Sequence, residues 1–201
     1  MKPVRRRERL KHELREQILA AAGQLFVQEG YSSVSVRKIA DAVGCAPATL
    51  YLYFEDKAAI LNAICVETFA KLDKRMEAVA NDQCDALERL RRGGRLYIQF
   101  GLDHPHHYWL TFGMEARDSF QNEALLQAGL RSFECMRTCV RACIDAGQIG
   151  VSDVDEAAQA IWSQVHGVVM LLICKTHFPF VERTRLIERV LDIGIEGLRK
   201  R

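Results

Sequence analysis

Three cysteines are the most reactive side chains that recur at a regular spacing in this chain. Cys135, Cys139 and Cys143 stand four residues apart, which places them on one face of a helix. Thiolates bind soft metals and undergo oxidation, so the stripe is a candidate metal- or redox-sensing site. The first and third thiols would lie about 12 Å apart along the axis, too far for one tetrahedral ion. A pair of them with a distant histidine, or small apolar residues packed in a helix core, are the two alternatives.

A second set of side chains suits the binding of a small organic molecule. Trp162, His166 and Met170 recur at the same four-residue spacing. Large aromatic side chains with a few polar groups are typical of ligand cavities. The alternative is ordinary core packing, with His166 as a hydrogen-bonded core histidine. The candidate ligand-binding residues are Phe100, His107, Tyr108, Phe112, Trp162, His166 and Met170.

The chain carries no sequence signature of an enzyme. It contains no glycine-rich phosphate loop, no nucleophile elbow and no paired carboxylates in a plausible pocket. Seven cysteines and six histidines leave a cysteine enzyme conceivable, but no local motif supports one. We therefore expect a binding protein without cofactor or metal.

Cysteine count and hydropathy bear on the compartment. Seven is an odd number, and the basic N-terminus is not followed by an apolar segment, so we expect a reducing cytoplasm. The longest apolar run, Gly167 to Cys174, is too short to span a bilayer. No membrane is expected among the partners.

Helices must position all of these side chains. No stretch alternates apolar and polar residues as a half-buried strand does, and three of the four prolines fall at plausible helix boundaries. The sequence predicts an all-α fold with about nine helices. Their expected ranges are about 9–29, 36–43, 47–53, from 57 to beyond 76, 83–102 (with a possible bend at Gly93-Gly94), 108–114, 120–146, 154–177 and 181–199.

Residues 34–57 have the pattern of a helix-turn-helix. Ser35 is a natural N-cap for a first short helix, whose apolar positions repeat at i, i+3, i+4 and i+7. Gly44 can adopt the positive φ of a tight turn, and Pro47 can open the second helix. Leu50 and Phe54 are spaced to pack back on the first helix. This leaves Pro47, Ala48, Thr49, Tyr51 and Tyr53 toward solvent, with Lys57 at the start of the next helix.

These residues closely resemble the signature of the TetR family of transcriptional regulators. The match runs from Ser35 to Ala40, through Gly44 and residues 49–54 to Lys57. The motif Trp162-x-x-x-His166-Gly167, which follows a His-Pro-x-x-Tyr stretch at 104–108, resembles a C-terminal domain class of the same family. The resemblance implies a DNA-binding domain over 1–56 and a helical ligand-binding and dimerisation domain over 57–201. One departure is Ala46, where the family usually has a capping Ser or Thr.

The resemblance and the side-chain chemistry together assign the DNA contacts. Phosphate contacts are expected from Ser35, Tyr51, Tyr53 and Lys57, and base-edge contacts from Arg37, Pro47, Ala48 and Thr49. Residues 46–54 carry no charge, so readout should use thymine methyls, hydroxyls and shape, with Arg37 able to grip guanine. The alternative is a buried three-helix unit with no role in DNA binding.

Charge is distributed unevenly along the chain. The net charge is only +2, but residues 1–60 carry +3 and residues 1–15 carry +5. Arg5, Arg6 and Arg7 would then follow phosphates or enter a minor groove, unless they form a solvated tail.

The last two helices are apolar on more than one side, which favours burial against a second copy of the chain. The expected protein is a homodimeric repressor of palindromic double-stranded DNA, released by a small hydrophobic or amphipathic effector. The helix from 57 would act as the lever between the domains. A metal- or redox-sensing repressor and a ligand-independent DNA-binding protein are the alternatives.

Overall fold

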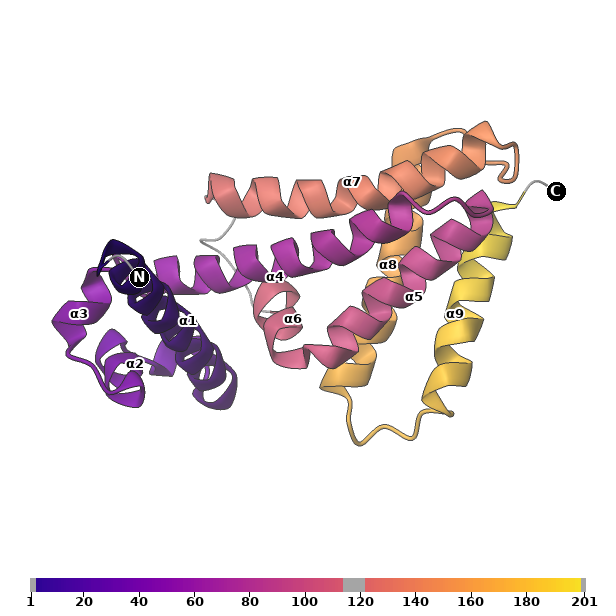
Figure 1. Cartoon of the computed structure of the whole chain (residues 1–201). Helices are drawn as coiled ribbons and strands as arrows, with labels where there is room; N and C mark the ends of the chain where they lie inside the picture. The colour runs from indigo at the N-terminus through magenta and orange to yellow at the C-terminus, as the bar shows by residue number, and fades with distance from the viewer. Residues whose placement is uncertain (1–2, 114–121, 200–201) are drawn as a thin grey trace. The chain divides into compact units, whose positions relative to one another are not determined.

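The computed structural model describes residues 3–113 and 122–199, and these ranges contain nine α-helices, one short 3-10 helix and a single β-bridge. The all-α prediction is thereby confirmed for the described part of the chain (Figure 1). The helices are α1 (Pro3–Glu29), η1 (Tyr31–Ser33), α2 (Val36–Val43), α3 (Pro47–Tyr51), α4 (Lys57–Ala80), α5 (Ala86–Asp103), α6 (Pro105–Phe112), α7 (Glu123–Asp145), α8 (Val154–Cys174) and α9 (Arg183–Leu198).

Several helix ends differ from the predicted ones. The first helix starts at Pro3 rather than near residue 9, because arginine favours helix and proline is tolerated in a first turn. The N-terminal basic segment is therefore helical from Pro3 onward, and η1 was not predicted. Helix α8 ends at Cys174, three residues early. The predicted boundaries at Met114 and Phe120 lie outside the described residues.

The packing divides the chain into two compact units. The first comprises Met1–Thr68 and His106–Leu125, and the second comprises Phe69–Pro105 and Leu126–Arg201, as far as they are described. Helix α4 contributes residues to both units. The functional division between residues 56 and 57 remains a prediction.

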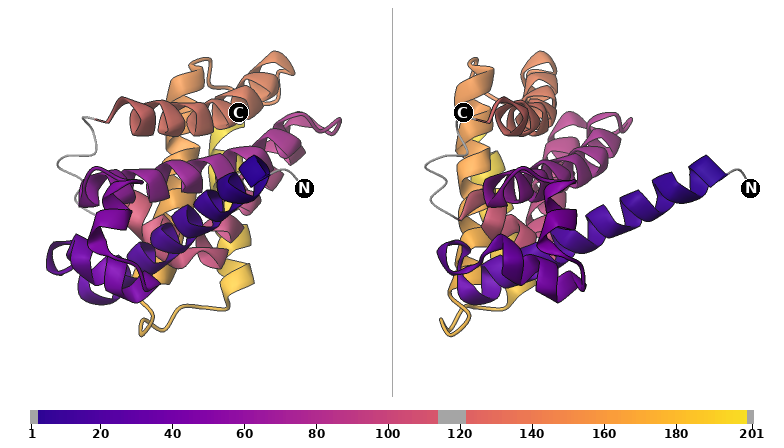
Figure 2. Two further views of the ribbon diagram at one scale, coloured as in Figure 1. Left: turned by 60° about the vertical axis from the view of Figure 1, so that its left-hand side comes forward. Right: turned by 90° about the vertical axis from the view of Figure 1, so that its left-hand side faces the viewer.

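The first unit is built around the apolar stripe of α1. Ile18 and Phe26 are buried together with Ile39 of α2 and Leu50 of α3. One end of α4 joins the same core through Ile60. The core therefore fixes α2 and α3 against α1, and the right-hand view of Figure 2 shows the first turns of α1 projecting away from these two helices.

In the second unit, α5 packs against both α8 and α9 (Figure 1). Its adjacent glycines, Gly93 and Gly94, are buried. A methyl group on Gly94 would lie 2.7 Å from Leu191 Cδ2, so the missing side chain permits this close approach. The sequence suggested a possible bend at this pair. In the structure α5 runs unbroken from Ala86 to Asp103, and Gly94 allows close helix packing.

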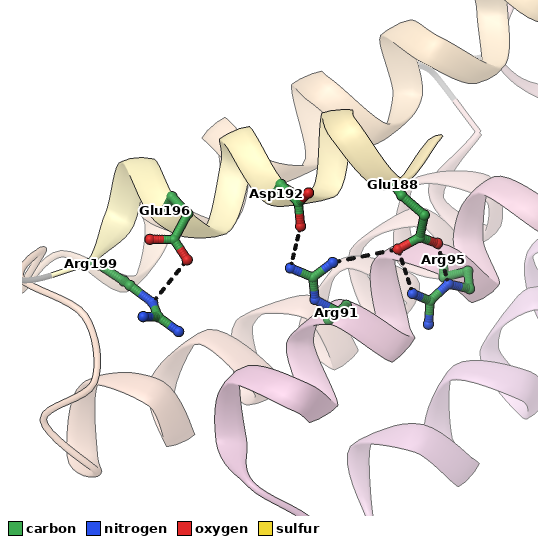
Figure 3. A network of polar contacts seen from close by, with 6 residues as sticks. All are labelled: Arg91, Arg95, Glu188, Asp192, Glu196 and Arg199. Atoms are coloured by element: carbon green, nitrogen blue, oxygen red, sulfur yellow. Dashed lines mark hydrogen bonds and ion pairs between the residues drawn. The ribbon is translucent and has the colours of Figure 1, made fainter. Parts of the chain in front are cut away.

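An ion-pair network ties α5 to α9 (Figure 3). Arg95 binds Glu188 with two parallel hydrogen bonds, each 2.7 Å long. Arg91 donates to Asp192 at 2.6 Å and also approaches Glu188. The hydrogen bonds and charge of Arg95 lower the pKa of the Glu188 carboxyl below its usual value. Paired forks of this kind fix geometry better than single surface ion pairs, so the network sets the register of α9 on α5.

Helix α8 is unusually apolar. By length and composition it could cross a membrane, although such a test is also passed by core helices of soluble domains. The uninterrupted apolar run from Gly167 to Cys174 did not reveal this property, because polar residues interrupt the longer apolar segment of α8. A third of that window is buried within the chain, and α8 runs beside α9 in both views of Figure 2. One such helix does not indicate a membrane protein.

We predict that Gly94→Ala destabilises the second unit while Gly93→Ala does not. The new methyl at position 94 would overlap the buried Leu191, at a cost of about 1–3 kcal/mol that exceeds the helix-propensity gain. A methyl at position 93 would meet its nearest atom, Met76 Cε, at 3.6 Å, an ordinary contact. Urea unfolding followed by circular dichroism measures both variants. Equal stability of Gly94→Ala and the unmodified chain would contradict the packing argument.

Candidate DNA-binding and effector sites

The local structure of residues 34–57 is that of a helix-turn-helix. Ser35 caps α2, because its Oγ accepts a hydrogen bond of 3.2 Å from the backbone N–H of Lys38. Gly44 has a φ of 76°, in the left-handed region, and Pro47 is the first residue of α3. The predicted turn is confirmed at each of these positions. Ala46 provides no side-chain cap, so this end of α3 lacks the hydroxyl common in the family.

The outer face of α3 carries no charged side chain. Leu50 is fully buried and Phe54 nearly so, as predicted from their spacing. On the opposite face Ala48 is exposed, Tyr51 is 56% exposed and Leu52 is 77% exposed. Sequence reasoning assigned no role to Leu52. Its spacing of four residues from Ala48 would have placed it on the same face.

The other predicted DNA contacts differ in accessibility. Ser35 and Arg37 are exposed at the start of α2. Pro47 and Thr49 are half-buried rather than fully directed to solvent. Tyr53 is also half-buried, because α3 ends at Tyr51 and the following turn packs this ring against the core.

Lys57 makes its contacts inside the first unit. Its Nζ donates a 2.7 Å hydrogen bond to the Tyr31 carbonyl and lies 4.2 Å from the centre of the Tyr31 ring. The ammonium group thus links the start of α4 to η1, which sequence reasoning did not foresee because the partners are 26 residues apart. A phosphate contact by Lys57 has to compete with this arrangement.

In the second unit, a chain of polar contacts connects α5 to α8. Trp162 Nε1 donates a 3.0 Å hydrogen bond to the Tyr97 hydroxyl, which lies 3.5 Å from His166 Nδ1. Burial lowers the pKa of His166, so the imidazole is neutral near pH 7. Tyr97 is buried, whereas Trp162 is 37% exposed and its ring packs edge-on against Phe133. The structure therefore brings Trp162 and His166 together, as predicted, around the unforeseen Tyr97. Tyr97 lies three residues before Phe100 on the buried stripe of α5, which was the available signal.

The remaining predicted ligand-binding residues fall in both units. Phe100 of the second unit is buried beside His104, and Met170 is half-buried on α8. His107, Tyr108 and Phe112 belong to α6 in the first unit, where the Tyr108 and Phe112 rings are 4.6 Å apart. A small crevice among α5, α8 and α9 contains none of the predicted residues. Its lining consists of Leu90, Ile161, Gln164, Val165, Val190, Leu191, Gly194 and Ile195.

Cys139 and Cys143 of the stripe on α7 are buried, and Cys135 is half-buried. All seven cysteines lie in the described ranges and are free thiols. Burial raises the pKa of Cys139 to about 11 and that of Cys143 to about 12, and it also raises the pKa of Cys135. Within residues 3–113 and 122–199, no three metal-ligating side chains are grouped to hold an ion. Metal or redox sensing through this stripe is not favoured, because the thiols stay protonated.

Comparison with known proteins extends over both units. Residues 18–64 match the model of bacterial regulatory proteins of the tetR family, and residues 90–193 match the tetracyclin repressor-like C-terminal domain. A fatty acid metabolism regulator protein of Bacillus subtilis is 36% identical over 74 residues, 37% of this chain and 38% of that protein. The nucleoid occlusion factor SlmA of Vibrio campbellii is 30% identical over 128 residues, 63% of this chain and 64% of that protein. The chain thus spans less than two thirds of the length of these curated relatives.

Solved structures share the fold. The transcriptional regulator FadR from Bacillus subtilis, in complex with stearoyl-CoA, superposes with a TM-score of 0.79 at 22% identity, covering 92% of this chain and 99% of that one. A TetR family regulator from Marinobacter aquaeolei has a TM-score of 0.78 at 21% identity, covering 96% and 100%. With its capped α2, glycine turn and two family matches, the chain belongs to the TetR family of bacterial regulatory proteins.

Proposed function

We propose that the protein is a ligand-responsive transcriptional repressor that binds palindromic operator DNA as a homodimer. The helix-turn-helix carries the proposal, because its second helix presents an exposed face held rigidly by a buried one. A helix of this kind enters the major groove. We place its action in the cytoplasm, where its DNA target would be.

The DNA contacts divide into two kinds. Ser35, Tyr51 and Tyr53 would bind phosphates, and Lys57 would do so only by leaving the Tyr31 carbonyl. The residues that would face base edges are Arg37, Pro47, Ala48 and Thr49. The exposed Arg6 and Arg7 on the first turns of α1 add positive charge to the same unit. Because α1 is helical from Pro3 onward, these two arginines belong to a helix and not to an irregular N-terminal segment.

The dimer would form through α8 and α9. Leu171 on α8 and Ile193 on α9 are exposed apolar side chains. Gly167 and Gly197 have open space around them among the described residues, which would let a second helix pair approach closely. An apolar face of this kind needs burial, and an isologous four-helix interface provides it. Two-fold symmetry then matches a palindromic operator.

The effector would be an amphipathic molecule with a long acyl chain. The relatives include a fatty acid metabolism regulator and a FadR bound to stearoyl-CoA. In the second unit, Trp162 and Met170 supply partly exposed apolar surface, and Phe100 is a buried apolar side chain. His166 and Tyr97 would be the polar partners. His107, Tyr108 and Phe112 of the first unit keep their proposed ligand role. The effector shifts DNA affinity only by its differential affinity for two states of the dimer, with α4 as the connecting lever.

The DNA proposal is tested by selecting duplexes from a random library with the full-length protein. We expect a palindromic consensus. Arg37→Ala should weaken binding to it by about 5- to 150-fold per half-site and relax the preference at one guanine, because a bidentate contact contributes about 1–3 kcal/mol. Fluorescence anisotropy measures the affinities. Selection of no consensus, or unchanged binding by Arg37→Ala, would count against operator recognition or against this residue, respectively.

Replacing Ala46 by Ser should restore the missing cap of α3. The added hydroxyl can accept a hydrogen bond from a backbone N–H of the first turn, so the first unit should gain about 1 kcal/mol. Thermal unfolding followed by circular dichroism measures the gain. The control is Ala42→Ser at an exposed position inside α2, which provides no cap and should lower stability slightly. Equal effects of the two changes would contradict the capping argument.

Stearoyl-CoA should weaken operator binding, whereas coenzyme A without the acyl chain should not. Tyr97→Phe should raise the stearoyl-CoA concentration needed for half-release by about fivefold, the effect of losing one hydrogen bond of about 1 kcal/mol. DNA affinity in the absence of effector should stay the same. Release that is indifferent to the acyl chain would exclude this effector class, and an unchanged half-release concentration would exclude the Tyr97 contact.

A further inference from the structure

The outer face of α3 ends in an exposed leucine that the fold does not require. Leu52 is 77% exposed, more than any other large apolar side chain in the described part of the first unit. Its neighbour Leu50, two residues earlier, is fully buried and holds α3 in place. Leu52 therefore contributes nothing to the core, and its apolar surface is available for a contact in a complex.

The backbone holds Leu52 in a fixed position. Its N–H donates to the Thr49 carbonyl at 3.2 Å, and the N–H groups of Tyr53 and Phe54 both donate to the Leu50 carbonyl, at 3.0 and 3.1 Å. The residue has helical dihedral angles. Its side chain thus projects from a defined backbone, on the face that also carries Ala48 and Tyr51. A backbone held by hydrogen bonds suits the precise recognition of a base edge.

The chemistry of this face restricts what Leu52 can recognise. Residues 46–54 carry no charge. A leucine cannot hydrogen-bond to a base, and the apolar feature that bases present in the major groove is the 5-methyl group of thymine. Ala48 is too short to reach as far as Leu52 does. We infer that Leu52 contacts a thymine methyl in each operator half-site and selects thymine there. This inference rests on the proposed operator binding.

The methyl group itself can be deleted from the DNA. With the consensus duplex obtained by selection, each symmetric pair of thymines is replaced by uracil, which lacks only the methyl. One pair should stand out, with affinity falling about fourfold per half-site and about 15-fold for the pair, the effect of one buried methyl group on each side. Leu52→Ala should weaken binding to the thymine duplex to a similar extent. In the Leu52→Ala protein, uracil at that pair should have little further effect, because the contact is already lost.

Two variants serve as controls. Leu10 is also an exposed leucine of the first unit, 50% accessible, but it lies on α1. The Leu10→Ala protein should bind both duplexes with the affinities of the unmodified protein. Arg37→Ala should weaken binding to the thymine and uracil duplexes by the same factor. Since Leu52 is exposed, its replacement should leave the circular dichroism melting curve unchanged.

The outcomes separate this inference from the proposal on which it rests. If uracil costs the same affinity with Leu52→Ala as with the unmodified protein, the leucine does not contact the methyl and the inference is overturned. The same holds if no thymine pair responds to uracil, as it would if Leu52 covered a deoxyribose or a protein partner. If no duplex is selected at all, it is the proposed operator binding that fails.

Discussion

A helix of five residues is not stable by itself, so α3 exists because Leu50 and Phe54 are buried against α1 and α2. This burial is the constraint on which the helix-turn-helix, and the DNA binding that we propose for it, depends. Two apolar anchors determine which face of α3 turns inward, and therefore which face turns outward. The outer face of α3 is therefore formed only when the helix-turn-helix folds. A substitution at Leu50 would remove both without touching a single residue of the outer face.

The second unit depends on a different constraint. Its helices are long, so the requirement is that they can pack closely against one another. Gly94 lets α5 lie close to α9, and the Arg91–Arg95–Glu188–Asp192 network fixes one helix along the other. Between α5 and α8, the Tyr97 hydroxyl connects Trp162 and His166 in a partly accessible place. A tightly fixed α5–α9 contact beside a polar, partly accessible α5–α8 contact is compatible with the dimer and the effector site that we propose for this unit.

Local chemistry explains what could be predicted from the sequence. Helix α2 has its predicted ends because Ser35, at one end, and Gly44, at the other, act within a few residues. The sequence did not reveal the Lys57–Tyr31 contact or the role of Tyr97, because each depends on segments brought together by tertiary packing. The effect of the Gly93-Gly94 pair also depends on tertiary packing, because glycine occurs both at helix bends and where two helices approach closely. The cysteine stripe is a case in which the sequence predicts the position of side chains but not their chemistry. Burial in the folded chain, which the spacing does not reveal, raises the pKa of the Cys143 thiol.

The contact of Lys57 with Tyr31 also has a thermodynamic consequence for DNA binding. Affinity for DNA falls with salt in proportion to the number of phosphates that a protein neutralises, because each one releases condensed counterions. A Lys57 ammonium that stays on the Tyr31 carbonyl releases none. The slope of log affinity against log salt would then be smaller by about 0.9 per subunit than a simple count of the basic residues near the operator suggests. The internal hydrogen bond of a single lysine would thus appear as a reduced sensitivity of the whole complex to ionic strength.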